Sequence, residues 1–178
     1  MMKYQNCSIR LAAIEDAKQL CEWWNDGAIM AHAGWPLGAK TTIEEVIERI
    51  TKSPSTRYII EYDDVPIGEM SARKVDESTA EVGIKICDSD YLDKGLGKIY
   101  LSLLFQHLFD EQGCESIILD TNVNNLRAQA TYKKLGFEEV SDQRRSWPDQ
   151  LGVMQYSIDY RLIKSDFNSF AENSRNNI

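Results

Sequence analysis

A strand, a glycine turn, a helix and a second strand follow one another between residues 80 and 121, and this succession constrains the fold most. Apolar and polar residues alternate from Val82 to Ile86, as on a strand with one buried face. After the glycine turn at 95–97, apolar residues recur at helical spacing as far as Leu108. The continuous run Ile117-Ile118-Leu119 is typical of a strand covered on both faces. The unit predicts two parallel strands joined by a right-handed crossover, with a ligand at the turn after the first strand.

That turn lies in the stretch DKGLGKIY, which places two glycines between Lys94 and Lys98. Glycine lets a backbone approach a ligand closely, and the first amides of a helix are unpaired donors that favour an anion. Two familiar phosphate motifs do not match. The dinucleotide fingerprint fails at Tyr100, and the P-loop pattern fails at Leu92 and Ile99. The flanking lysines nevertheless favour a pyrophosphate at this turn rather than a plain tight turn.

A second segment, NLRAQATYKKLGF, predicts a helix with defined ends. Asn125 suits the N-cap, Ala128 and Tyr132 share one helical face, and Gly136-Phe137 suits a glycine C-cap with its hydrophobic contact. Read alone, the segment is a capped amphipathic helix with a core tyrosine.

Read together, the two segments resemble the GNAT family of acetyl-CoA-dependent N-acetyltransferases. In that family the pattern Q/R-x-x-G-x-G/A opens the pyrophosphate-binding helix, and it maps onto residues 92–97. The family's N-x-x-A-x-x-x-Y-x-x-x-G-F helix maps onto residues 125–137. Leu92 stands where the family has Gln or Arg, which removes one contact. The resemblance runs from about residue 8 to 163. The tract Trp23-Trp24-Asn25-Asp26 and the ending MQYSIDYRL look like the branch of ribosomal-protein N-terminal acetyltransferases, which also resembles aminoglycoside 6'-N-acetyltransferases.

The resemblance implies an α/β fold with a mixed, mostly antiparallel seven-stranded sheet and helices on both faces. The sheet would be splayed between strands 80–87 and 116–121, and the pantetheine arm would enter the splay. The last strands are expected at 138–145 and 153–162, joined by a turn at Pro148-Asp149. We expect a single domain over residues 1–163 and a fraying polar tail over 164–178.

The rest of the chain fits this plan. Short strands are expected at 8–12, 57–62 and 66–73, and a helix at 16–24. A second helix follows Thr41, which is expected to form a capping box with Glu44.

The chemistry of amine acetylation then suggests roles for particular side chains. An amine must lose a proton before it attacks a thioester, so the reaction needs a base. The candidate bases are Glu81 and Glu69. We rank Glu81 first because its strand faces the cofactor. Either glutamate is equally well explained as a solvated strand residue. A backbone amide near Ile86 would stabilise the oxyanion. The resemblance assigns protonation of the leaving thiolate to Tyr132.

The resemblance also implies a set of cofactor-binding residues, which lie on the crossover unit and the second helix: Ile84, Ile86, Cys87, Leu92, Asp93, Lys94, Gly95, Leu96, Gly97, Lys98, Asn122, Asn125, Arg127, Ala128 and Tyr132. The aromatic tract 23–35 is expected to roof the acceptor pocket. Its substrate-binding candidates are Trp23, Asp26, His32 and Trp35, whereas Trp24 is expected to pack its own helix. Glu22, Asp26 and Glu69 are candidates for recognising a cationic acceptor.

Composition narrows the class of protein. The 178 residues suit one domain, and the formal net charge of −8 argues against nucleic-acid binding and favours a cationic substrate. We find no apolar run long enough for a membrane span and no signal peptide. The four cysteines are scattered and only two histidines accompany them, so we expect no metal site and free thiols in the cytoplasm.

Three functions remain open at this point. The first is acetyl-CoA-dependent acetylation of a protein N-terminus or a small amine. The second is acetylation of an aminoglycoside or polyamine. The third is a non-catalytic acyl-CoA-binding module, which the presence of Tyr132 disfavours. The sequence does not decide between a monomer and a homodimer.

Overall fold

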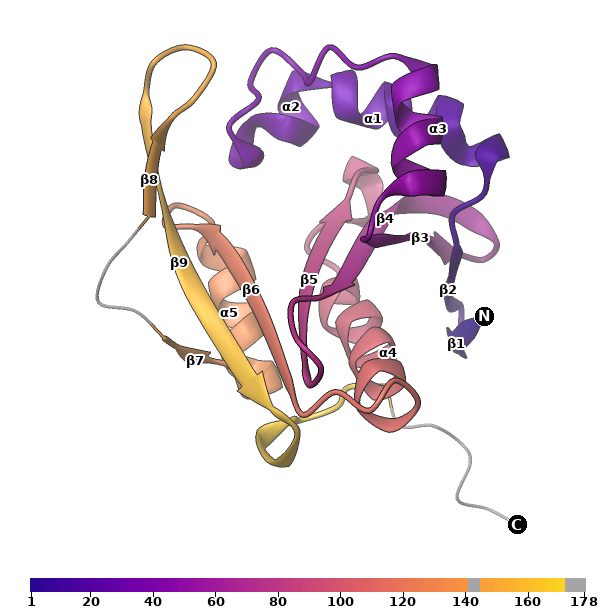
Figure 1. Cartoon of the computed structure of the whole chain (residues 1–178), viewed down its shortest axis with the longest axis vertical. Coiled ribbons are helices and arrows are strands. Elements are labelled where there is room, and N and C mark those ends of the chain that lie inside the picture. The colour runs from indigo at the N-terminus through magenta and orange to yellow at the C-terminus, as the bar shows by residue number, and fades with distance from the viewer. Residues whose placement is uncertain (141–144, 172–178) are drawn as a thin grey trace.

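A computed structural model of the chain describes residues 1–140 and 145–171, and a single nine-stranded sheet crosses the described part (Figure 1). The strands are β1 (Met2–Tyr4), β2 (Cys7–Leu11), β3 (Thr56–Tyr62), β4 (Val65–Lys74), β5 (Thr79–Ile86), β6 (Ser116–Asn122), β7 (Glu138–Glu139), β8 (Arg145–Pro148) and β9 (Met154–Ile163). The α-helices are α1 (Ala17–Asn25), α2 (Gly27–Met30), α3 (Ile43–Lys52), α4 (Leu96–Asp110) and α5 (Leu126–Leu135). No helix in these ranges is long and apolar enough to cross a bilayer.

The strand order is β1-β2-β3-β4-β5-β6-β9-β7, with β8 also paired to β9. Within the described ranges β5 and β6 form the one parallel pair, and every other pair is antiparallel. The expected mixed, mostly antiparallel sheet is therefore confirmed. The expected number of seven strands was too low for two reasons. A hairpin adds β1, and the single strand expected at 138–145 is two short strands that pair with different parts of β9. Residues 141–144 of that expected strand lie outside the described residues.

The sheet splays where the sequence predicts. β5 and β6 pair over three residues only, from Thr79–Ser116 to Glu81–Ile118. Beyond that point β6 continues to pair with β9 as far as Asn122, while β5 continues to pair with β4 as far as Ile86. Each strand follows its antiparallel partner, so the two halves of the sheet diverge, as Figure 1 shows.

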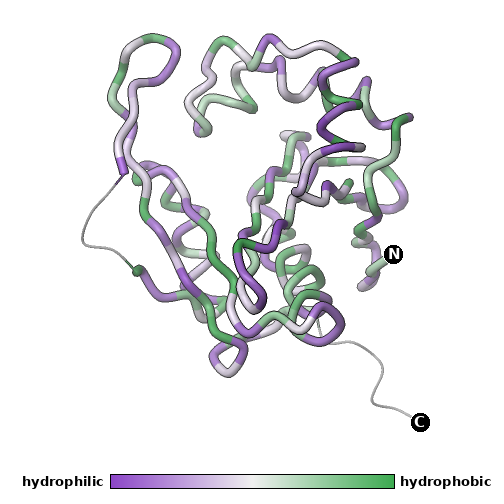
Figure 2. The backbone as a smooth tube through the Cα atoms, viewed as in Figure 1, coloured by the Kyte–Doolittle hydropathy of each residue, from purple (hydrophilic) through white to green (hydrophobic). Residues whose placement is uncertain are grey.

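Two apolar clusters cover the two faces of the sheet. β3 shows the alternation clearly, because Tyr58 and Ile60 join the cluster under α4 while Ile59 joins the cluster under α1 and α3. The larger cluster contains most of α4, whose tube is largely green in Figure 2. An almost wholly buried helix between the sheet and the C-terminal segment explains why the apolar spacing of this helix is so dense in the sequence.

Helix ends follow local capping signals. The expected capping box forms one residue later than predicted, because Thr42 accepts from the amide of Glu45 and the Glu45 carboxylate accepts from the amide of Thr42. The Thr41 hydroxyl also donates a hydrogen bond to the Glu45 carboxylate. At the C-terminal end of α5, Gly136 adopts φ +99° and terminates the helix, as the sequence predicts.

The domain extends beyond residue 163, which corrects the expected boundary. Phe167 packs edge-on against Phe105, and Ala171 is fully buried. The Ser102 hydroxyl accepts from the amide of Phe170 and so fixes this segment to α4. The polar composition from Lys164 onward misled the prediction, because a few apolar residues anchor the segment through residue 171. The expected tail residues 172–178 lie outside the described residues.

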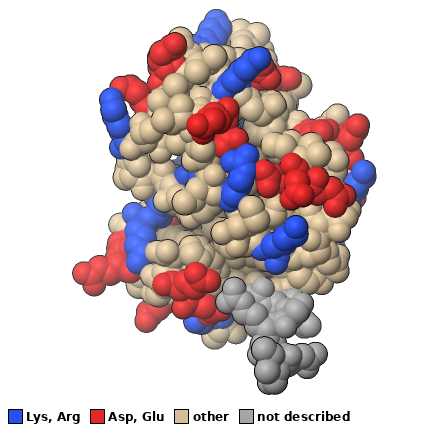
Figure 3. All heavy atoms as spheres, turned by 90° about the vertical axis from the view of Figure 1, so that its right-hand side faces the viewer, with Lys and Arg blue, Asp and Glu red and all other residues tan. Residues whose placement is uncertain are grey.

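The acidic excess of the chain is not gathered on the face formed by β1, β2 and α3. Figure 3 shows acidic and basic side chains interspersed over that face. The net charge of −8 therefore does not appear on this face as one continuous acidic patch.

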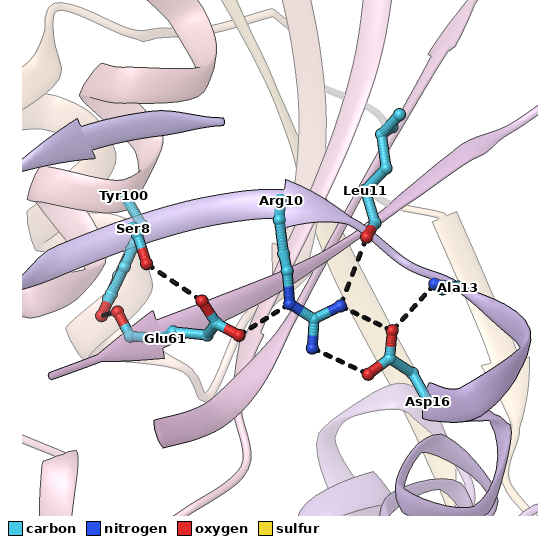
Figure 4. A network of polar contacts seen from close by, with 7 residues as sticks. All are labelled: Ser8, Arg10, Leu11, Ala13, Asp16, Glu61 and Tyr100. Atoms are coloured by element: carbon cyan, nitrogen blue, oxygen red, sulfur yellow. Dashed lines mark hydrogen bonds and ion pairs between the residues drawn. The ribbon is translucent and has the colours of Figure 1, made fainter. Parts of the chain in front are cut away.

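One polar network on that side ties β2, β3, α4 and the start of α1 together (Figure 4). The Arg10 guanidinium donates to both oxygens of Asp16 at 2.7 and 2.8 Å, and to Glu61 at 2.7 Å. Ser8 donates to the second oxygen of Glu61, and the Tyr100 hydroxyl donates to the Glu61 carbonyl at 2.7 Å. A bidentate guanidinium–carboxylate pair is a strong, directional contact, so Arg10 fixes where α1 begins relative to the sheet.

Replacement of Arg10 should therefore destabilise the fold. Arg10→Met leaves Glu61 and Asp16 without their cation, and we expect roughly 2–4 kcal/mol of lost stability at pH 7, measured by urea unfolding. Arg10 lowers the pKa of Asp16. Its contribution is therefore full above the pKa of an unfolded aspartate, about 3.9, and is lost as pH falls through the lower folded value.

The stability difference between the two proteins should accordingly shrink below about pH 4. Arg73→Met is the matched control, because it breaks the more exposed pair with Glu81 and should cost under about 1 kcal/mol. Equal losses for the two variants would show that the Arg10 network has no special role.

Candidate active site

Two cavities meet at β5, on either side of residues 83–85. The larger, of about 810 Å³, lies in the splay between β5, the start of α4, the end of β6 and α5. The smaller, of about 320 Å³, lies between β4, β5, α1 and the segment around Trp35. Gly83, Ile84 and Lys85 line both. The two cavities therefore adjoin at these three residues.

The start of α4 forms one wall of the larger cavity. Gly95 precedes the helix with φ +72°, a conformation that favours glycine, and Asp93 is also left-handed at φ +59°. The first amides of α4, from Leu96 to Lys98, have no intrahelical acceptor. No atom lies within 4 Å of where a Cβ on Gly97 would stand, so the approach to these amides is open. The turn therefore has the geometry of an anion site.

The residues implied as cofactor-binding come together in this cavity with one exception. Lys94 lies outside the lining, with its ammonium 5.2 Å from the centre of the Tyr91 ring. The Lys98 ammonium lies 4.5 Å from the Phe170 ring, at the edge of the anion site. The fourteen of these residues that line the cavity are Ile84, Ile86, Cys87, Leu92, Asp93, Gly95, Leu96, Gly97, Lys98, Asn122, Asn125, Arg127, Ala128 and Tyr132.

The turn before α5 is held in place by its own asparagines. The side-chain oxygen Oδ1 of Asn125 accepts from the backbone amide of Ala128 and caps the helix, as predicted. The side chain of Asn122 accepts from the amide of Asn124 and donates to Gln155 on β9. Arg127 reaches across to Asp93 at 3.1 Å, so an ion pair links α5 to the turn that precedes α4. These asparagines therefore support the cavity wall besides lining it.

Tyr132 lies on α5 against the far wall of the larger cavity. Its ring packs against Phe137 and Tyr160, with centroids 5.7 and 5.6 Å away. Burial, with a further contribution from Asp120, raises the pKa of the phenol well above its ordinary value. No described residue accepts a hydrogen bond from its hydroxyl. The phenol therefore keeps its proton at neutral pH and is available to donate it into the cavity.

The two predicted bases lie in different places. Glu81 forms an ion pair with Arg73 and lines neither cavity. Glu69 lines the smaller cavity, but its oxygens already accept from Trp24 at 2.7 Å and from Arg57 at 2.5 Å. The structure therefore brings Glu69, not the first-ranked Glu81, to the cavities, and it surrounds Glu69 with donors. Among the described residues, no three His, Cys, Asp or Glu side chains are grouped as metal ligands.

A carboxylate that the sequence analysis missed stands in the larger cavity. Asp120 follows the buried run of β6, and 41% of its side chain is open to solvent. Desolvation by the surrounding protein nevertheless raises the pKa of Asp120. The positive charge of Arg145, 3.5 Å away, opposes this shift, and the negative charges of Asp159 and Glu81 add to it. The signal available in the sequence was its position at the carboxyl end of the second strand of the crossover, opposite the glycine turn.

The aromatic tract contributes two of its four predicted substrate-binding residues to the cavities. Trp35 lines the smaller cavity and His32 the larger. Trp23 is buried in the cluster under α1, and Asp26 caps α2 by accepting from Ala28 and Ile29. Trp24, predicted to serve only packing, lines the smaller cavity while its indole donates to Glu69.

The tip of the β8–β9 hairpin contacts the segment 34–38, which belongs to the other half of the molecule. Gln150 at its tip accepts from the amide of Leu37, donates to the Gly38 carbonyl through its side chain, and donates to the Gly34 carbonyl through its amide. Trp147 of β8 lines the larger cavity. The hairpin therefore bridges the two halves of the sheet above the point where the cavities meet, an arrangement that no local sequence signal predicted.

Comparison with known proteins agrees with this architecture. The family model described as "Acetyltransferase (GNAT) domain" matches residues 7–138. An aminoglycoside N(6')-acetyltransferase type 1 of Klebsiella pneumoniae is 26% identical in an alignment of 148 residues that covers 74% of this chain and 73% of that protein. A spermine/spermidine N(1)-acetyltransferase of Bacillus subtilis (strain 168) is 41% identical over 51 residues, or 29% of this chain and 34% of that protein.

Solved structures show the same fold. A spermidine N-acetyltransferase from Vibrio cholerae, in complex with CoA and spermine, superposes with a TM-score of 0.79 at 18% identity and covers 91% of this chain and 98% of that one. The aminoglycoside acetyltransferase AAC(6')-Ib, in complex with coenzyme A and kanamycin, gives a TM-score of 0.71 at 22% identity over 90% of this chain and 96% of that one.

Proposed function

The chain belongs to the acetyltransferase (GNAT) family, and from that premise we propose that it transfers the acetyl group of acetyl-CoA to a primary amine. The amine attacks the thioester directly, in a complex that holds both substrates. The observation that carries this proposal is the meeting of the two cavities at Gly83, Ile84 and Lys85. One cavity has an anion site and a buried phenol, and the other is small and lined by tryptophans.

The larger cavity fits coenzyme A. The unpaired amides at the start of α4 suit the pyrophosphate, and the open space at Gly97 lets it approach them. Beyond Glu81 the edge of β5 that faces β6 has no strand partner among the described residues, so its amides and carbonyls are available to the amides of the pantetheine arm. When bound, acetyl-CoA supplies the thioester carbonyl that the amine attacks.

Asp120 is the carboxylate best placed to accept the proton of the amine. It is open to the larger cavity, its pKa is raised, and its nearest cation is 3.5 Å away. Glu69 is a weaker candidate because both of its oxygens are occupied by donors. Glu81 acts at a distance, since its charge contributes to the raised pKa of Asp120.

The protonation states of Tyr132 and Cys87 favour direct transfer of the acetyl group from the thioester to the amine. Tyr132 keeps its proton and is placed to donate it to the leaving thiolate. Cys87 also lines the cavity. Burial raises the pKa of its thiol, and the negative charge of Glu69 makes a smaller contribution in the same direction. A protonated thiol is a poor nucleophile, so an acetyl-cysteine intermediate is disfavoured. The proposal that the enzyme works in a reducing cytoplasm is supported by all four cysteines being free thiols.

The acceptor is a small amine. The family members named above act on aminoglycosides or on spermine and spermidine, according to their names. The similarity to ribosomal-protein N-terminal acetyltransferases remains a prediction from the sequence, as does a protein N-terminus as acceptor. The smaller cavity, at about 320 Å³, is at the low end of the size of small-molecule sites and favours the small amine.

Gly97→Val should abolish coenzyme A binding. A Cβ at this position meets no atom outside its own stretch of helix, so we expect the variant to fold, but the branched side chain fills the approach to the helix amides. For the parent protein, a hundredfold excess of CoA over its dissociation constant should add about 2.7 kcal/mol of stability and raise the melting temperature by about 5 °C or more. The variant should show no rise.

Lys94→Ala is the matched control, because Lys94 lies at the same turn but outside the cavity lining, and it should bind CoA nearly as tightly as the parent. Unchanged CoA binding by a folded Gly97→Val protein would place the pyrophosphate elsewhere.

Asp120→Asn should lower kcat by about 10²–10⁴-fold if Asp120 is the general base. Because protonation of a base stops catalysis, the activity of the parent should fall as pH decreases through the raised pKa of Asp120. That acid limb should be absent from the variant. Glu81→Gln is the control: we expect kcat within about tenfold and an acid limb shifted to lower pH, since one neighbouring negative charge is removed. Loss of rate in Glu81→Gln with retention in Asp120→Asn would restore Glu81 as the base.

Tyr132→Phe separates catalysis from binding alone. It keeps the ring packing on Phe137 and Tyr160 but removes the hydroxyl, so kcat should fall by about 10²–10⁴-fold while CoA affinity changes little. Turnover equal to that of the parent would remove Tyr132 from the mechanism. The same measurements exclude or favour a non-catalytic acyl-CoA-binding module, since such a protein would bind CoA but release no thiol with any amine.

A further inference from the structure

The charge of the smaller cavity is opposite to that of the whole chain. Three cations, Arg49, Arg57 and Lys85, line it together with one carboxylate, Glu69. The chain as a whole carries −8. A cavity that is to receive a polycation needs a surplus of negative charge, and this cavity has a surplus of positive charge. The net charge, which in the sequence favoured a cationic substrate, therefore does not describe the site.

One of the three cations is neutralised within the protein. Arg57 donates to Glu69 at 2.5 Å and stacks over Trp24, 4.6 Å from the ring centre. Trp24 holds the other oxygen of Glu69. Each oxygen of this carboxylate therefore already accepts a hydrogen bond, and its charge is balanced by Arg57, so it adds no surplus negative charge to attract an incoming ammonium group.

The other two cations retain capacity for a ligand. Lys85 reaches Glu69 only at 3.8 Å, and its closer contact, at 2.8 Å, is the thioether of Met30, a weak acceptor. Arg49 stacks over Trp24 at 5.3 Å and makes no ion pair in the described part of the chain. Glu45, one turn earlier on the same helix, accepts hydrogen bonds from Thr41 and Thr42, and these, with a smaller contribution from the charge of Arg49, lower the pKa of Glu45.

The positions of these cations orient a ligand. Lys85 lies where the two cavities meet, and Arg49 lies on α3 at the rim of the smaller cavity. An acceptor must present its amine toward the larger cavity, where Asp120 and Tyr132 stand. The remainder of the acceptor then lies in the smaller cavity, against the tryptophans and within the field of the two cations.

We infer that the acceptor is a small amine that carries an anionic group, a carboxylate or a phosphate, and that Arg49 and Lys85 bind this group. The inference rests on the proposed function and names its substrate class. It assigns the enzyme to amino acid-like or aminoalkyl phosphate acceptors rather than to the polycationic kanamycin and spermine bound by its structural neighbours.

The test compares acceptors that differ in one group. Initial rates of CoA release are measured with each amino acid and its amide, with phosphoethanolamine and ethanolamine, and with spermine and kanamycin. The amide is the less basic amine of its pair, so a preference for the acid cannot come from easier deprotonation. For at least one pair, kcat/KM should be roughly 10- to 100-fold higher for the anionic member, as expected for a charged hydrogen bond. The two kinds of pair distinguish a carboxylate from a phosphate.

Two substitutions connect the preference to the cavity. Arg49→Gln should lower kcat/KM for the preferred anionic amine about tenfold and change it less than threefold for the uncharged partner. Gly83→Asp places a carboxylate where both cavities meet. The nearest atom to the new Cβ is the Ser71 hydroxyl at 3.0 Å, which can rotate away. This variant should reduce the preference for the anion and improve spermine relative to the anionic amine; the rates are compared at saturating acetyl-CoA, because Gly83 also lines the larger cavity.

The outcomes separate this inference from the function on which it rests. If spermine or kanamycin has a higher kcat/KM than every anionic amine, the inference is wrong and the acetyltransferase activity stands. The inference is equally wrong if Arg49→Gln lowers kcat/KM alike for both members of a pair. If CoA binds but no amine releases thiol, calorimetric binding of the same pairs to the CoA-loaded protein decides it, and equal affinities would overturn it. Absence of CoA binding would overturn the proposed function itself.

Discussion

The short parallel pairing of β5 with β6 is the constraint on which the rest of the structure depends. Three residue pairs, from Thr79–Ser116 to Glu81–Ile118, hold the two halves of the sheet together. Beyond them each strand follows its own antiparallel neighbour, and the sheet opens. A longer pairing would close the larger cavity and cover the edge of β5. A shorter one would leave the halves joined mainly by α4 and by the β8–β9 hairpin.

The opening places unlike environments side by side. Helix amides and an open glycine face one end of the larger cavity, a buried phenol and an accessible aspartate face the other, and the cation-lined cavity adjoins it through Gly83, Ile84 and Lys85. The raised pKa values of Tyr132 and Asp120 both follow from placing polar groups among packed protein at the splay. One keeps a phenol protonated and the other makes a carboxylate a better base, so a single structural feature tunes both groups in the direction that amine acetylation needs.

The sequence predicted the features that are determined by residues close together in the chain, such as turns and helix ends. The crossover unit, the glycine turn at 95–97, the Asn125 cap and the Gly136 terminus follow from residue spacing and glycine chemistry, and the structure confirms each. It did not predict which of two adjacent tryptophans faces the cavity, because that depends on how α1 is rotated against β4. Asp26 serves as a cap and Glu81 as half of an ion pair, and only tertiary contacts reveal those partners. Lys85 and Arg49 come from separate elements, so their meeting at the smaller cavity had no local sequence signal, whereas the position of Asp120 at the end of β6 offered one.

The central claim is that the splay holds the thioester where the two cavities meet, and a crystal structure with coenzyme A and an amine acceptor tests it most directly. The account predicts the pyrophosphate on the amides of residues 96–98 and the pantetheine arm along the free edge of β5. It predicts the sulfur within hydrogen-bond reach of the Tyr132 hydroxyl and the acceptor amine entering from the smaller cavity. Coenzyme A bound outside the splay, or a sulfur turned away from both Tyr132 and residues 83–85, would contradict it.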